Sequence, residues 1–184
     1  GGLQGTIFKN WDYAVAFNWT ENEQTESNPS GYFRESQLFP LLATGVVNPF
    51  GDNTEAVRNQ VLATQVSGDI RKSTATNYGF DGKVSTELFK LPAGSVAMAL
   101  GGDWHKEELD IINTELYQSG DIIGGSGAIP SLEGANRDVW AIYGEFNIPI
   151  IKSVEANVAI RYDDYSDFGG TTNPKISLRW QPSK

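Results

Sequence analysis

The sequence lacks cysteine and contains one histidine and one methionine in 184 residues. Without cysteine it forms no disulfides and no thiolate metal sites. Basic residues are also scarce, because 14 Lys and Arg stand against 23 Asp and Glu and leave a net charge of -9. A nucleic-acid-binding surface needs clustered Lys and Arg to neutralise phosphates. The chain has no such cluster, so we do not expect nucleic acid as a partner.

Long apolar runs are missing too, and the longest pieces are short ones such as VAMAL and IPII. A membrane-spanning helix needs about 20 apolar residues, so a helical membrane protein is excluded. A transmembrane barrel is not excluded, because its strands carry only a weak alternating signal. The chain begins GGLQGTIF, without an initiator Met, a basic stretch or an apolar stretch. We therefore expect any signal peptide to have been removed or to lie outside this sequence.

Alternation of apolar and polar residues is the main feature that is present. The stretch WDYAVAFNW at 11–19 places five bulky apolar side chains on one side of an extended chain and Asp, Ala and Asn on the other. The same period predicts an all-β fold of about seven strands. Their expected ranges are 3–8, 11–24, 72–91, 95–113, 137–148, 153–164 and 172–181.

The connections alternate between tight and long. Tight turns are expected at 9–10, 91–94 and 149–152, and long loops at 25–71, 114–136 and 165–171. In the first long loop, the DNTE sequence at 52–55 predicts an N-cap and a short helix after it, while Pro40 is expected to break a helical turn in SQLFPLLA. Strands joined in this way form an antiparallel up-and-down meander with all long loops at one end, as in outer-membrane barrels.

Large aromatic residues lie at the ends of the apolar rows, and small or aliphatic residues such as Val15 and Gly144 lie in the middle. A globular core concentrates its bulk at the centre, whereas a membrane barrel carries aromatic girdles at both interfaces. From Trp11 to Trp19 is eight residues, which on tilted strands rise roughly 20 Å, close to the apolar band of about 25 Å. We interpret these residues as a membrane girdle: Trp11, Trp19, Trp104, Trp140, Tyr162 and Trp180.

The opposite rows carry charged residues on most strands and must face water. In a barrel this water fills the lumen, which predicts a set of lumen-lining residues: Asp81, Lys83, Asp103, His105, Glu107, Arg161 and Asp163. The exposed face of a soluble sheet would carry the same pattern. Polarity therefore leaves a soluble sandwich open as an alternative.

Neither metal binding nor catalysis is predicted. His105 with Asp103 and Glu107 would supply metal ligands, but three residues on one strand point along a line and do not converge on one ion. The carboxylates of Asp163 to Asp167 would suit Ca²⁺, yet they lack the spacing of an EF-hand loop. The sequence contains neither a nucleophile elbow nor a pair of carboxylates that would indicate an active site. We expect neither a cofactor nor an enzyme.

The run RYDDYSDFGGTTNPKISLRWQP at 161–182 resembles a signature of TonB-dependent outer-membrane receptors. NPFG at 48–51, GKVSTELFKLPAGSVAMALGGDWHKEE at 82–108 and YGEFNIPI at 143–150 resemble the same family in the same order. The resemblance implies part of a 22-stranded barrel in the outer membrane of a Gram-negative bacterium. No TonB box, plug or closing strand is recognisable, so we expect a middle segment of a larger receptor, with lipid, the remaining strands and the plug as neighbours and the TonB complex reached through that plug.

Such a receptor imports a scarce nutrient, which the resemblance leaves open as a siderophore, vitamin, saccharide or peptide. By their place in loops and at strand ends, ten residues are candidates for binding a small-molecule or oligomeric ligand: Phe33, Arg34, Asn48, Phe50, Tyr117, Asp121, Arg137, Tyr165, Asp167 and Phe168. The alternative from another class is a soluble all-β module that binds a saccharide or a similar ligand.

Overall fold

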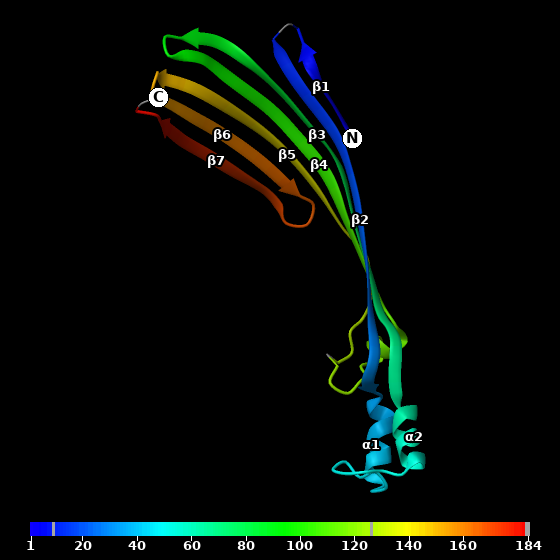
Figure 1. Cartoon of the computed structure of the whole chain (residues 1–184). Coiled ribbons are helices and arrows are strands. Elements are labelled where there is room, and N and C mark those ends of the chain that lie inside the picture. Colours follow the sequence, from blue (N-terminus) through cyan, green and yellow to red (C-terminus); the bar gives the residue numbers. More distant parts are fainter. Residues whose placement is uncertain (9, 126, 183–184) are drawn as a thin grey trace. The chain divides into compact units, whose positions relative to one another are not determined.

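All seven strands belong to one sheet, in the order in which they occur in the chain (Figure 1). The computed structural model describes residues 1–8, 10–125 and 127–182. The strands are β1 (Gly2–Ile7), β2 (Trp11–Phe33), β3 (Gln65–Leu91), β4 (Gly94–Asn113), β5 (Leu132–Ile151), β6 (Val154–Tyr165) and β7 (Gly169–Trp180). The predicted meander is confirmed.

Among the described residues, three helices lie in the connections: α1 (Glu35–Ala43), α2 (Glu55–Ala63) and α3 (Glu115–Ser119). The helix predicted after the DNTE sequence is α2, and its N-cap Thr54 accepts a hydrogen bond from the amide of Val57 at 3.4 Å. The prediction that Pro40 breaks the preceding helix is wrong, because Pro40 lies inside α1. Proline cannot donate to the carbonyl four residues earlier, and its ring crowds that carbonyl, yet α1 continues past Pro40 to Ala43. α3 was not predicted.

Two strands are longer than predicted, so the loop expected at 25–71 spans only 34–64. Residues 25–33 belong to β2 and residues 65–71 to β3. Polar pairs join these extensions, such as the 3.4 Å contact of Nη1 of Arg71 with Glu26 and the hydrogen bond from Ser27 to Asp69. An alternation of apolar residues does not reveal strands that are held together by polar pairs.

The loop predicted at 165–171 is instead a turn of three residues, 166–168. Tyr165 pairs with Gly169 across β6 and β7, and Gly169 has a φ of 85°, which residues other than glycine adopt only with strain. The loop expected at 114–136 also ends early, because β5 begins at Leu132. In the turn expected at 9–10, Lys9 lies outside the described residues, as does Ser126 of the second long loop.

The chain divides into two units. Unit 1 comprises residues 1–21, 76–108 and 136–184, and holds the tight turns and all of β1, β6 and β7. Unit 2 comprises residues 22–75 and 109–135, with the three helices and the continuations of β2 to β5. No helix among the residues that the structure describes is long and apolar enough to cross a membrane.

The register of unit 1 separates an apolar face from a polar face. Leu3 pairs with Val15, and Val158 pairs with Ile176. Because residues that pair across strands point to the same side, the predicted apolar rows share one face. No large side chain in the described chain is fully buried. The described residues form a single sheet without a closed core, which gives no support to the two-sheet sandwich.

Candidate functional site

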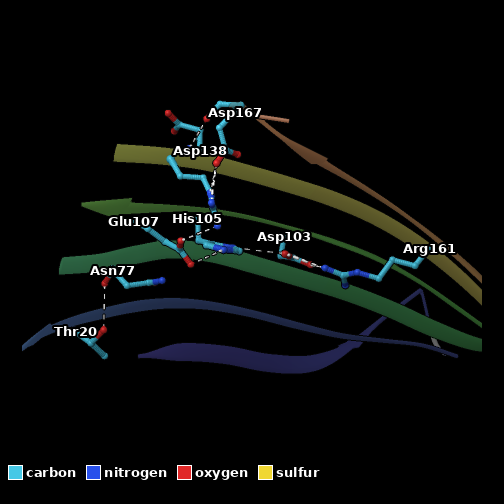
Figure 2. Close-up of polar contacts among 10 residues, drawn as sticks. Thr20, Asn77, Asp103, His105, Glu107, Asp138, Arg161 and Asp167 are labelled. Atoms are coloured by element: carbon cyan, nitrogen blue, oxygen red, sulfur yellow. Dashed lines mark hydrogen bonds and ion pairs between the residues drawn. The ribbon is translucent and has the colours of Figure 1, made fainter. Parts of the chain in front are cut away.

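The polar face of unit 1 carries a row of acidic and basic side chains at ion-pair distances, with one histidine among them, which we call the ion-pair ladder (Figure 2). It begins at Asp163, whose carboxylate lies 2.7 Å from Nε of Arg161. Nη2 of the same guanidinium lies 3.0 Å from Asp103 on β4. Arg161 thus joins β6 to β4 across β5. Its Cζ also lies 5.8 Å from the ring centre of Tyr143 on β5, so one side chain connects three strands.

His105 continues the ladder between two carboxylates. Its Nδ1 lies 3.9 Å from Asp103 and its Nε2 lies 3.7 Å from Glu107. Glu107 lies 3.7 Å from Nη1 of Arg137, which contacts Asp167 at 2.7 Å through Nη2. Acidic and basic groups therefore alternate from β6 to the β6–β7 turn.

The histidine does not form a metal site with these neighbours. Its two ring nitrogens face different carboxylates, and ligands of one transition-metal ion must converge at about 2.0–2.2 Å from it. No group of three potential metal ligands is present in the part of the chain that the structure describes. Five of the seven predicted lumen residues join the ladder. Asp81 instead accepts a hydrogen bond from Asn18, and Lys83 lines a polar hollow beside Asp12.

Four of the ligand candidates meet at the β6–β7 turn and form what we call the rim cluster: Arg137, Tyr165, Asp167 and Phe168. The rings of Tyr165 and Phe168 stack with centres 4.3 Å apart and planes at 20°. The Arg137 guanidinium carbon lies 6.0 Å and 5.6 Å from these two centres. The hydrogen bond to Asp167 raises the pKa of the Arg137 guanidinium above its ordinary value. The cluster holds one permanent cation against two aromatic rings.

Asp121 has a structural role in unit 2. Its carboxylate accepts hydrogen bonds from the backbone amide and the hydroxyl of Ser36, both at 2.7 Å. Arg34, at the N-cap of α1, makes no side-chain cap and lies 3.8 Å from Asp121. Asp121 therefore supplies the missing cap from the second loop. The hydrogen bonds from Ser36 hold the pKa of this carboxyl below its usual range.

Arg71 and Asn113 form a second polar centre in unit 2. Nε of Arg71 donates to Asn113 at 3.0 Å, and the guanidinium lies 5.0 Å from the ring centre of Tyr117. Asn113 is 3% exposed and donates to the carbonyls of Ile129 and Pro130. These bonds fasten the second long loop to β3 and β4. Tyr117 was among the ligand candidates, whereas Arg71 and Asn113 were not predicted, because no motif marks them.

The remaining ligand candidates belong to unit 2, whereas the rim cluster belongs to unit 1. Asn48 and Phe50 belong to a tight turn, in which the Phe50 amide donates to Oδ1 of Asn48, and the Phe50 ring is 98% exposed. The carbonyl of Phe33 accepts a hydrogen bond from the amide of Ile123. The structure brings together the candidates of the rim cluster, and it also pairs Arg34 with Asp121.

The predicted girdle residues lie on the apolar face. Trp140 and Tyr162 have ring centres 5.4 Å apart, and Trp104 meets Tyr78 edge-on at 6.0 Å. Trp180 is exposed and lies opposite Val154 at the tight-turn end, as Trp11 lies opposite Ile7. Trp19 is also exposed. Aromatic residues thus mark both ends of the apolar rows.

Comparison with known proteins agrees with this architecture. Residues 2–184 match the family model described as TonB dependent receptor-like, beta-barrel. A mutant of the ferric enterobactin receptor PfeA from Pseudomonas aeruginosa, in complex with enterobactin, is similar with a TM-score of 0.56 and 16% identity. The siderophore receptor PirA from Acinetobacter baumannii is similar with a TM-score of 0.54 and 16% identity. No curated protein sequence matches the chain.

Each of these alignments covers 98% of this chain and 22% of the solved receptor. The chain therefore spans about a fifth of the length of the receptors it matches. At this level of identity the likeness shows the fold alone, which is a segment of a large β-barrel.

Proposed function

Because the chain belongs to the TonB-dependent receptors, outer-membrane proteins of Gram-negative bacteria, as part of their β-barrel, we propose that it forms part of the wall and outer loops of a nutrient import channel. The nutrient is a siderophore, vitamin, saccharide or peptide. Its neighbours in the receptor are the remaining strands and a plug, through which the TonB complex acts. The family consists of receptors and transporters, and the chain binds and conducts without bond chemistry.

The observation that carries this proposal is the two-faced sheet of unit 1. Its apolar face exposes aliphatic side chains, with Ile176 at 76% and Leu178 at 69%. An exposed apolar face of this extent requires a covering, and aromatic residues at both ends of its rows suit a bilayer with two interfaces. We assign lipid to this face.

The polar face is then the channel wall. Its ion-pair ladder satisfies charged groups with one another, so the wall can be hydrated without exposing unpaired charge to a passing ligand. The ion pair of Arg161 on β6 with Asp103 on β4 also fixes the positions of these two side chains. The rim cluster lies at the far end of this face from the tight turns and is the proposed first contact for the ligand.

A growth experiment tests the proposal. A strain that lacks the complete receptor should grow poorly when one iron chelate, vitamin, sugar or peptide is the only source of that nutrient, and normally on the others. The same defect should occur in a strain that lacks TonB. Expression of the receptor should restore growth only where TonB is present. Normal growth of the receptor mutant on every source would contradict an import function.

A further inference from the structure

Phe168 is an exposed aromatic residue held in a fixed position. Its side chain is 66% exposed, although one face stacks on Tyr165 at 4.3 Å. The turn beneath it is fastened to β5 by two bonds: the Ser166 amide donates to the Asp138 carbonyl at 2.9 Å, and the Asp138 amide donates to Oγ of Ser166 at 3.0 Å. A ring that is already ordered loses little conformational entropy when a ligand stacks on it.

The charges around this ring do not favour an anionic ligand. Nε and Nη2 of Arg137 both donate to Oδ2 of Asp167, at 2.9 Å and 2.7 Å, and Nη1 faces Glu107 at 3.7 Å. The guanidinium donors are therefore directed at the protein's own carboxylates. One cation against two anions leaves these three groups with a net charge of about −1, which repels a ligand carboxylate or phosphate.

The rim cluster offers a ligand an aromatic surface and a hydrogen-bond acceptor. The aromatic surface is that of Phe168. The acceptor is Oδ1 of Asp167, which takes part in none of the contacts described for residues 1–8, 10–125 and 127–182. A sugar ring matches this pair, because its C–H face packs on an aromatic ring and its hydroxyl groups donate to a carboxylate oxygen.

We propose that the rim cluster binds a neutral sugar ring, with Phe168 as the stacking surface and Asp167 as the hydroxyl acceptor. This inference rests on the proposed import function, and it selects the saccharide class from the four nutrient classes. Arg137 is a positioning residue, since it holds Asp167 and covers the edge of the two rings.

Calorimetry on the complete receptor in detergent tests the inference with defined probes. The probes are three neutral hexasaccharides, namely maltohexaose, cellohexaose and xylohexaose, and the anionic hexagalacturonate. At least one neutral probe should bind, and the anionic probe should bind about tenfold more weakly or not at all. Phe168→Ala should weaken binding of the neutral probe about tenfold, because the bound sugar would cover this ring and truncation of such an aromatic contact costs at least about tenfold in affinity, whereas Phe168→Trp should retain it.

Phe89→Ala is the matched control, because Phe89 is an exposed phenylalanine of unit 1 near the tight turn that joins β3 and β4. It should leave the affinity unchanged. Asp167→Asn removes one negative charge and should increase the affinity for hexagalacturonate. Barrel folding of each variant is checked by its heat-dependent migration in gel electrophoresis.

Three results would overturn the inference: no binding of any neutral probe, tighter binding of hexagalacturonate than of the neutral probes, or unchanged affinity in a folded Phe168→Ala receptor. These results leave the import function standing if the growth experiment shows a TonB-dependent defect on another nutrient. Normal growth of the receptor mutant on every nutrient would instead contradict the proposed import function itself.

Discussion

Asn113 offers the sharpest test of how the second long loop is held. Its side chain accepts from Nε of Arg71 at 3.0 Å and donates to the carbonyls of Ile129 at 3.1 Å and Pro130 at 2.9 Å. Asn113→Ala removes all three bonds at a position that is 3% exposed. A neutral bond contributes about 1 kcal/mol and one to a charged group about 1.5–3 kcal/mol. Arg71 can still reach water, so the expected loss is about 3–4 kcal/mol.

This loss should appear as local opening, since the loop is a small part of the chain and the sheet does not depend on it. At about 1.4 kcal/mol per tenfold change, backbone amides within 113–131 should exchange with deuterium on the order of 10²–10³ times faster. The measurement is hydrogen exchange by mass spectrometry on the complete receptor. Protection in β6 and β7 should not change.

Asn53→Ala is the matched control. Asn53 also makes three side-chain bonds, which close the turn at Asn48 and Gly51. It belongs to the first loop, so its removal should speed exchange there and leave 113–131 as it was. Unchanged exchange in 113–131 for Asn113→Ala would refute the assignment of Asn113 as the residue that fastens the loop.

Two further outcomes follow from the cap and from the apolar face. Because the pKa of Asp121 is lowered, its contact with Ser36 is complete at and above the ordinary pKa of a carboxyl group and is lost only as pH falls through the lowered value. Asp121→Asn should speed hydrogen exchange in the first turn of α1 at neutral pH. Equal exchange in the variant and the unmodified receptor would contradict the capping role of Asp121. Val15→Arg on the apolar face should destabilise the assembled receptor by about 2–4 kcal/mol, measured as loss of folded barrel in outer membranes. Ala16→Arg on the polar face should assemble normally. Equal assembly of the two variants would contradict the assignment of lipid to the apolar face.

The sequence predicts most of the unit 1 sheet because its strands keep one apolar side. The row from Trp11 to Trp19 is an example, since each bulky residue repeats at every second position. The same test fails in unit 2, where β2 and β3 continue through polar pairs such as Glu26 with Arg71. Periodicity reports a whole row of side chains that faces a core or lipid, and in these extensions only isolated residues such as Asn28 and Val66 are buried.

The site was predictable only in part, for a related reason. Arg137, Tyr165, Asp167 and Phe168 could be proposed because three of them lie close together in sequence and Arg137 begins the strand predicted at 137–148. The pairing of Arg71 with Asn113 joins residues 42 positions apart. It depends on the register of two strands, which a single sequence does not specify.

The cap on α1 comes from a residue 85 positions later in the chain. The first loop therefore does not contain everything its own helix requires. Transplanting residues 34–64 alone into another barrel should deliver a helix with a frayed beginning, whereas transplanting them with 114–131 should deliver both loops intact. Engineers who exchange surface loops between receptors of this kind should treat the two segments as one cassette, and natural recombination between such genes would face the same constraint.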